Sequence, residues 1–154
     1  MMPLLKAQAI DALPWQRKLH LLDAQAQRDA KRLDLATGLT QLGVQIMRLE
    51  PGRAAWPLHR HLYEEQCFYV LSGRGEVQFE AASEAIGVGD FLGFAAGGLA
   101  HALVNCGEEP LVLLAARTRL ELDVCDYPAH GKRLYMNGAE EALVELGAVG
   151  RDEG

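Results

Sequence analysis

The pattern of apolar and polar positions changes near residue 43. From there to residue 117, short apolar or alternating runs are separated by clusters of Gly, Pro and Asn. Runs of four to eight residues between such clusters are typical of antiparallel strands in a sandwich or barrel. The sequence therefore predicts an all-β core. Its runs are VQIMRL (44–49), CFYVLS (67–72), EVQFE (76–80), GDFLGF (89–94), HALVN (101–105) and LVLLAAR (111–117).

The segments on either side of this region differ from it in residue composition. Residues 15–36 are rich in Ala, Gln, Arg and Leu with few β-branched residues, which favours helix. The apolar stripe of this helix would be Leu19, Leu22, Ala26 and Leu33. Pro128 and Gly131 indicate a structured loop or arm, and a second short helix is expected near Asn137. Its apolar side would carry Ala142, Leu143 and Leu146.

The length of 154 residues fits one domain with a sizeable core. We expect an N-terminal extension (1–36), a β-barrel domain (37–120), and a C-terminal arm and tail (121–154). The N-terminal segment and the arm could pack against a second barrel, so we expect a homodimer.

Charge and cysteine content narrow the class of protein. A formal net charge of -6 argues against nucleic acid as a partner, because binding phosphates needs a basic face. Cys67, Cys106 and Cys125 show no C-x-x-C spacing, so a reducing, cytoplasmic setting is expected. The apolar run at 111–116 is far shorter than the roughly 20 residues of a membrane helix. No membrane partner is therefore expected, and a small molecule is the expected ligand.

Histidines carry the candidate chemistry. His59 and His61 lie at i and i+2, so in a strand their side chains point to the same side. His101 opens a later predicted strand, and antiparallel pairing could bring it back against them. In a strand over 66–72, alternation turns Gln66 inward and Glu65 outward unless a bulge re-aims it. Neutral imidazoles with an oxygen ligand suit a divalent transition metal, namely Zn, Fe, Mn, Ni or Cu.

Two motifs in this region resemble those of the cupin superfamily. The first reads Gly52, six residues, His59-Arg60-His61, four residues, Gln66, six residues and Gly73. The second reads Gly89, five residues, Ala95, Ala96, Gly97, three residues, His101, three residues and Asn105. The resemblance implies a double-stranded β-helix, or jelly roll, with a metal held by His59, His61, Gln66 and His101. Gln66 replaces the usual Glu of this family, which implies weaker metal binding, and Glu65 or Glu64 could substitute for it through a local bulge. Ala95 replaces the usual Pro, which costs only turn rigidity.

The resemblance also suggests functions. The flanks look like a group of bacterial single-domain cupins, some of which carry the label sugar-phosphate isomerase. Such an isomerase needs a base, for which the candidates are Glu64, Glu65 and Tyr69. It also needs a cation for phosphate; no phosphate cradle is visible, and the available side chains are Arg48, Arg60, Arg74 and Arg117.

Two alternatives remain at this stage. A metal-dependent dioxygenase would need an apolar pocket, which Phe68, Phe79, Phe91 and Phe94 could partly line. A non-enzymatic cupin that binds a small molecule is the other. The remaining histidines, His20 and His130, are expected to face solvent.

Overall fold

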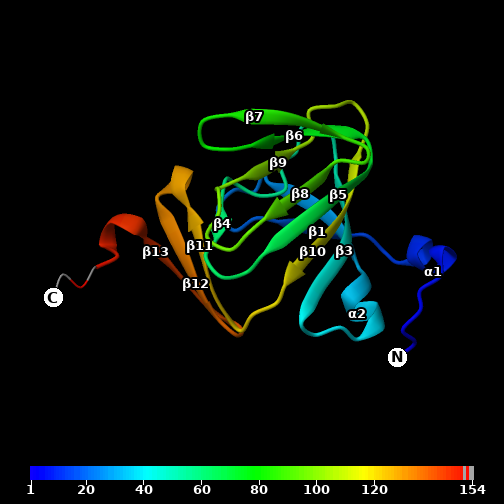
Figure 1. Cartoon of the computed structure of the whole chain (residues 1–154), viewed down its shortest axis with the longest axis horizontal. Coiled ribbons are helices and arrows are strands. Elements are labelled where there is room, and N and C mark those ends of the chain that lie inside the picture. Colours follow the sequence, from blue (N-terminus) through cyan, green and yellow to red (C-terminus); the bar gives the residue numbers. More distant parts are fainter. Residues whose placement is uncertain (151, 153–154) are drawn as a thin grey trace.

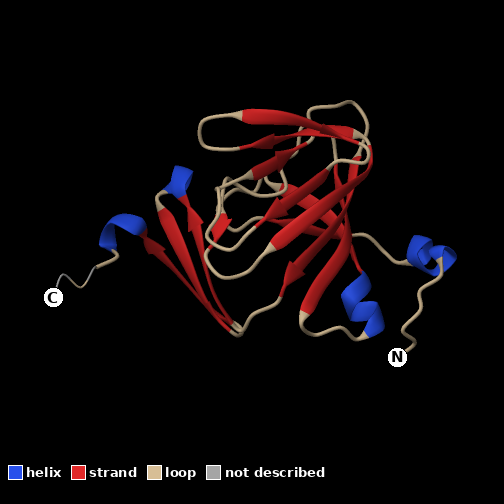
Figure 2. Cartoon of the chain, in the orientation of Figure 1, coloured by secondary structure: helices blue, strands red, loops and turns tan. Residues whose placement is uncertain are grey.

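The computed structural model describes residues 1–150 and 152, and these form three antiparallel sheets (Figures 1 and 2). The largest sheet has the strand order β1 (Gln16–Leu19), β2 (Gln27–Arg32), β3 (Leu42–Leu49), β10 (Leu111–Thr118), β5 (Gln66–Ser72) and β8 (Phe91–Phe94). The second has the order β13 (Glu140–Glu145), β12 (Lys132–Asn137), β11 (Leu122–Tyr127) and β4 (Arg60–His61). The third has the order β7 (Ser83–Gly87), β6 (Arg74–Gln78) and β9 (Ala102–Val104). The all-β prediction is confirmed.

Helices are few and short in the described part of the chain. The α-helices are α1 (Ala7–Ala12) and α2 (Leu33–Thr37), and the 3-10 turns are η1 (Pro128–His130) and η2 (Leu146–Ala148). Within the described residues, no helix combines the length and the apolar character needed to cross a membrane.

The core follows the alternation of the strands. In β10, which pairs with both β3 and β5, Leu111, Leu113 and Ala115 are buried and alternate with partly buried residues. Phe68 and Val70 are buried on β5, on the face that Gln66 shares. The same core cluster includes Met47, Leu49, Trp56, Val77 and Leu103. The inner face of β5 therefore carries both core residues and one polar side chain.

A tight turn joins β5 to β6 at Gly73. Its φ is +80°, a region that residues with a side chain rarely adopt. A Cβ added there would lie only 2.3 Å from the carbonyl oxygen of Pro110. Glycine is therefore required at this position by both conformation and space.

The helix expected over residues 15–36 is wrong for most of its length. Residues 16–19 and 27–32 form β1 and β2, a hairpin that adds to the edge of β3, and only residues 33–37 are helical. The short N-terminal helix lies earlier, at α1. Pairing with β3 buries Ala30 to 1% exposure opposite Met47, so tertiary packing outweighs helix propensity.

The helix expected near residue 137 is also wrong. Residues 140–145 form β13, which pairs along its full length with β12. The 3-10 turn η2 follows it. In Figure 1, β11, β12 and β13 lie together at one side of the barrel, and β11 connects this layer to the barrel through β4.

Candidate metal and ligand site

Antiparallel pairing brings three histidines side by side. His59 and His101 form a bridge in which each backbone N–H donates to the carbonyl of the other, at 3.1 and 2.9 Å. The ring of His59 lies 4.8 Å from that of His101 and 5.2 Å from that of His61, between centroids. Phe94 stacks on His101 with ring centroids 3.4 Å apart. The histidine cluster is therefore fixed by backbone pairing and by aromatic packing.

The hydrogen bonds of these rings define which nitrogen is free. Nδ1 of His59 lies 3.2 Å from the carbonyl oxygen of Pro57, and Nδ1 of His101 lies 3.1 Å from that of Leu99. A carbonyl oxygen only accepts, so each Nδ1 carries the proton and each Nε2 keeps its lone pair. Nδ1 of His61 contacts Oδ2 of Asp123 at 2.5 Å, which favours the same tautomer. All three rings therefore have Nε2 as their potential ligand atom.

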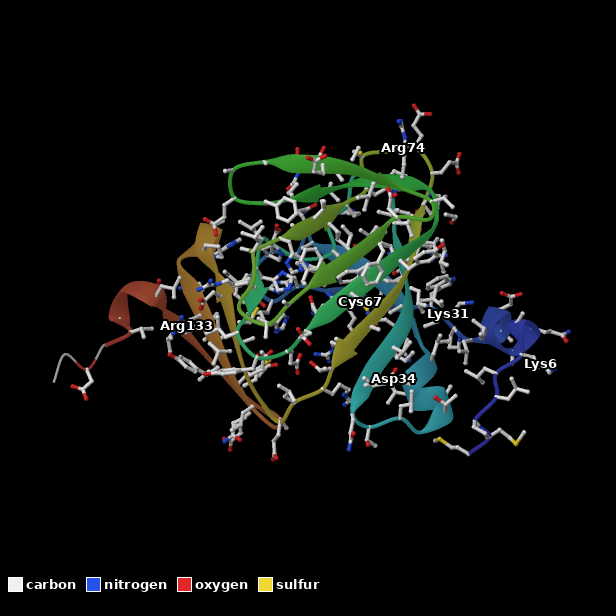
Figure 3. All side chains as sticks on the ribbon, in the orientation of Figure 1. Lys6, Lys31, Asp34, Cys67, Arg74 and Arg133 are labelled. Carbon is white, nitrogen blue, oxygen red and sulfur yellow. The ribbon has the colours of Figure 1, made fainter. Side chains whose placement is uncertain are left out.

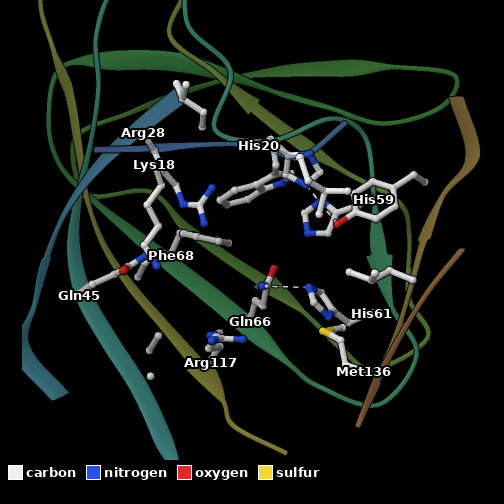
Figure 4. A pocket seen from close by; sticks show the side chains of 18 of the residues that line it. Lys18, His20, Arg28, Gln45, His59, His61, Gln66, Phe68, Arg117 and Met136 are labelled. Carbon is white, nitrogen blue, oxygen red and sulfur yellow. Dashed lines mark hydrogen bonds between the residues drawn. The ribbon is translucent and has the colours of Figure 1, made fainter. Parts of the chain in front are cut away.

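Gln66 completes this cluster from β5. Its amide nitrogen lies 3.3 Å from Nε2 of His61, as the dashed line in Figure 4 marks. Its Oε1 and the Nε2 of His101 are buried without a hydrogen-bond partner among the described residues. Buried polar atoms are normally paired, so two orphaned acceptors in one cluster point to an absent electrophile or donor.

Two cavities meet at His61 and Gln66. The larger, about 330 Å³, lies against His59 and His61 and is drawn in Figure 4. That volume is at the lower end of the range for small-molecule sites, roughly 300 to 1,000 Å³. The smaller, about 10 Å³, is also bounded by Glu64 and His101. It has room for about one water-sized occupant.

Burial keeps two of the imidazoles neutral. Burial, with smaller effects from His101 and His61, lowers the pKa of His59 well below its ordinary value. Burial lowers the pKa of His101 to about 4. Neutral rings at neutral pH can donate a lone pair to a metal without first losing a proton.

The three candidate bases lie in different places. Glu64 is buried, accepts from Nη1 of Arg117 at 3.0 Å and from the amide of Leu120 at 3.1 Å, and borders the smaller cavity. Glu65 is exposed and Tyr69 is 44% exposed on the outer face of β5. Of the three, only Glu64 borders either cavity.

Asp123 is a functional candidate that sequence reasoning missed. Its carboxylate contacts His61 and accepts from the backbone amides of Tyr63 and Glu64 at 3.2 and 3.3 Å. The ligand atoms of His61, Glu64 and Asp123 all lie within 4.8 Å of one another. Asp123 is on β11, 62 residues from His61, and no local motif marks it.

A second close group consists of His59, His61 and Cys125. Burial raises the pKa of the Cys125 thiol to about 12, so it stays protonated and is a poor ligand. The ligand atoms of His59, His61 and His101 do not all lie within 4.8 Å of one another. Nitrogen ligands about 2.1 Å from one ion lie no more than about 4.2 Å apart, so recruiting His101 requires some rotation of these rings.

His20 departs from its expected solvent-facing position. It is half-buried at the wall of the larger cavity, where Nε2 lies 3.1 Å from the hydroxyl of Tyr127. His130 is exposed, as expected.

The predicted phosphate-binding arginines are mostly engaged elsewhere. Arg48 pairs with Asp29, Arg60 pairs with Asp126, and Arg74 is exposed at the far edge of the barrel (Figure 3). Arg117 alone among the four borders the larger cavity. The other cations of that cavity come from the segment expected to be helical, and they are Lys18, Arg28 and Arg32.

Comparison with known proteins agrees with this architecture. The family model described as Cupin domain matches residues 45–117. A solved structure from Acidithiobacillus ferrooxidans, provisionally named a sugar phosphate isomerase, is 40% identical with a TM-score of 0.95. The alignment covers 98% of this chain and 97% of that one. The chain belongs to the cupin superfamily.

Two further solved structures support the fold of this cupin. A sugar phosphate isomerase of the cupin superfamily from Silicibacter pomeroyi is 24% identical, with a TM-score of 0.82 and coverage of 93% and 94% of the two chains. A predicted oxalate decarboxylase from Thermotoga maritima is 23% identical, with a TM-score of 0.61 and coverage of 72% and 96%. No curated protein sequence matched. The matched family region contains the histidine cluster and Gln66, but the cations of β1 and β2 and Asp123 lie outside it.

Proposed function

We propose that this cupin is a metal-dependent isomerase of a small phosphorylated sugar. The ligands of the proposed divalent transition metal are His59, His61, Gln66 and His101. The observation that carries the proposal is the pair of orphaned acceptors, Oε1 of Gln66 and Nε2 of His101, in a cluster whose imidazoles all present Nε2. The adjoining cavity of about 10 Å³ offers room for an ion.

The donor set fits several metals. Three imidazole nitrogens and one amide oxygen suit Zn, Fe, Mn, Ni and Cu alike. A bound divalent ion supplies Lewis acidity to a carbonyl or hydroxyl oxygen of the substrate. Gln66 is neutral, so the site keeps one more positive charge than it would with a glutamate at this position.

Residues around the cluster have distinct proposed tasks. Asp123 holds the ring of His61 in the tautomer that presents Nε2, as carboxylates beside metal-binding histidines do. Glu64 is the proposed base that takes a proton from the carbon beside the carbonyl and, after exchange with solvent, delivers a proton to the former carbonyl carbon. The hydroxyl proton on the first carbon moves to the former carbonyl oxygen, so the atoms balance. Arg117 and the amide of Leu120 fix the position of the Glu64 carboxylate. Trp56 and Phe68 provide an apolar wall to the larger cavity and limit water near the reacting carbon.

The similarity to the Acidithiobacillus protein supports the choice of reaction. At 40% identity over nearly the whole chain, the two proteins share the flanks as well as the barrel. The provisional name of that protein makes sugar phosphates the first substrates to test.

Metal content tests the ligand set directly. Elemental analysis is expected to find near-stoichiometric metal in the wild type and in the control variant His130→Ala, whose side chain is exposed. His101→Ala is expected to lose most of the metal while remaining folded by circular dichroism. Equal metal in all three proteins, or an empty wild type after incubation with each of the five metals, would refute the ligand set.

Proton exchange tests the reaction. Wild-type protein loaded with metal is expected to interconvert an aldose phosphate and its ketose phosphate, and to incorporate deuterium from D₂O at the reacting carbon, as followed by NMR. Glu64→Gln is expected to keep its metal and lose both signals. A metal-loaded wild type that turns over no member of a sugar-phosphate panel would sink the isomerase proposal.

A further inference from the structure

Like charges face each other on the N-terminal hairpin. Lys18 of β1 and Arg28 of β2 are direct cross-strand partners, so their side chains leave the same face of the sheet. Both border the larger cavity (Figure 4). Like charges directly opposite each other destabilise a sheet, so such a pair needs a compensating anion.

The described part of the chain provides no carboxylate partner for either residue. Arg28 donates one bond, to the carbonyl of Ala55 at 3.3 Å, and its guanidinium lies 5.9 Å from the ring centroid of Trp56. The ion pairs of the described residues include neither Lys18 nor Arg28. The Arg28 charge is therefore held beside the cavity by a carbonyl and an aromatic face, without a carboxylate to neutralise it.

Two more cations face the same space, and each has a partner. Arg32 pairs with Asp34 and Arg117 with Glu64. Glu141, which is exposed, is the one carboxylate that borders the cavity within the described ranges. The cavity wall is therefore strongly positive in a protein whose formal net charge is -6.

A glycine makes room for one of these cations. Gly43 of β3 is the cross-strand partner of Arg117. A Cβ at Gly43 would lie 3.0 Å from Cγ and 3.1 Å from Nε of Arg117, closer than ordinary contact. The absence of a side chain at residue 43 lets the Arg117 side chain lie across β3 toward the cavity.

Burial and mutual repulsion both disfavour the charged forms of these cations. Partial burial, followed by the charges of Arg28, Arg32 and Arg117, lowers the pKa of Lys18. Burial, followed by the charge of Arg117, lowers the pKa of Arg28. A bound anion would relieve both effects.

We propose that Lys18 and Arg28, assisted by Arg117, form the subsite for the phosphate group of the substrate. Figure 4 shows Lys18, Arg28 and Arg117 on one side of the cavity, His59 and His61 on the other, and Gln66 between them. When the cations bind the phosphate group, the oxygenated carbons of the same molecule extend toward the histidines. The inference rests on the proposed function for the identity of the molecule, but the subsite can be tested without turnover.

Phosphate binding by calorimetry is the test. Inorganic phosphate is titrated at constant ionic strength into chelator-treated wild type, a Lys18→Gln/Arg28→Gln double variant, and the control Arg74→Gln, which removes an exposed cation outside both cavities. The double variant is expected to bind phosphate at least about tenfold more weakly, because it lacks two charged hydrogen-bond donors to the phosphate oxygens. The control is expected to match the wild type.

Two further variants separate a subsite from a folding effect. Arg28→Lys keeps the charge and is expected to retain most of the affinity. Gly43→Ala displaces Arg117 and is expected to weaken phosphate binding without removing any charge. Equal phosphate affinity in wild type and double variant, or no binding to the wild type, would overturn the proposal.

The same titration distinguishes this inference from the proposed metal site. His101→Ala is expected to lose metal and keep phosphate affinity. The Lys18→Gln/Arg28→Gln variant is expected to keep metal and lose phosphate affinity. If the protein binds no metal but its phosphate affinity depends on Lys18 and Arg28, the anion subsite stands and the metal proposal fails. If it binds metal but its phosphate affinity does not depend on these cations, only the subsite is rejected.

Discussion

Asn105 is expected to act as a structural clamp rather than a ligand, although it belongs to the same motif as His101. Its side chain is fully buried and makes three hydrogen bonds to the backbone. Nδ2 donates to the carbonyls of Leu49 and Glu109, both at 2.8 Å, and Oδ1 accepts from the amide of Gly107 at 2.9 Å. These bonds tie the loop after β9 to the end of β3.

Replacing Asn105 with alanine removes all three bonds. At about 1 kcal/mol net for each, and with backbone groups left unpaired, the free energy of unfolding should fall by about 3 kcal/mol. For a domain of this size, that loss corresponds to a fall of roughly 6 to 12 °C in the melting temperature. Metal content per folded molecule is expected to stay at the wild-type value, because Asn105 borders neither cavity.

Urea unfolding and elemental analysis together check this reasoning. Asn137→Ala is the matched control, since Asn137 is exposed, and it should change stability by less than about 0.5 kcal/mol. A loss below about 1 kcal/mol for Asn105→Ala would show that the three bonds do not clamp the loop. Loss of metal from a variant that remains folded would show that Asn105 acts at the site itself.

Three other predictions follow from single positions. Gln66→Glu adds a carboxylate to the proposed ligand set, so competition against a chelator should show tighter metal binding; unchanged or weaker affinity would count against Gln66 as a ligand. Gly73→Ala should cost well over about 1 kcal/mol in urea unfolding, because its Cβ would meet the carbonyl oxygen of Pro110 at 2.3 Å, and a neutral result would contradict the turn geometry. The pKa of Asp29 is lowered chiefly by its hydrogen bond to Arg17. Its contribution to the free energy of unfolding is therefore present above about pH 4 and is lost as the carboxylate is protonated below that pH. The stability difference between wild type and Asp29→Asn should therefore shrink as the pH falls below about 4, and a constant difference would refute this linkage.

The barrel could be predicted from sequence because its strands are marked locally. Alternation places Phe68 and Val70 in the core and turns Gln66 to the same face. The spacing of His59 and His61 sets their common side in the same way. These inferences need only the two-residue period of a strand, so they do not depend on knowing which strands pair.

The N-terminal hairpin could not be predicted in the same way. The residues of β1 and β2 are mostly good helix formers, and what makes them strands is pairing with β3, a tertiary contact. A helix over this segment would not place Lys18 opposite Arg28, so the cation pair could not be predicted from the sequence. Asp123 was missed for a related reason, since its contact with His61 depends on the pairing of β11 with β4.

The positions of these residues in the chain indicate which segment supplies each part of the proposed site. The histidines and Gln66 lie within the segment that matches the family model, whereas Lys18 and Arg28 lie before it. If the barrel supplies the metal ligands and the added hairpin supplies Lys18 and Arg28 of the anion subsite, with Arg117 of β10 assisting, metal binding and anion binding should vary independently. Changing β1 and β2 should then alter which anion is accepted while leaving metal content intact, whereas changes to the histidines should remove metal while leaving phosphate affinity. Substrate choice would in that case be a property of the extension that pairs with β3, and reactivity a property of the barrel.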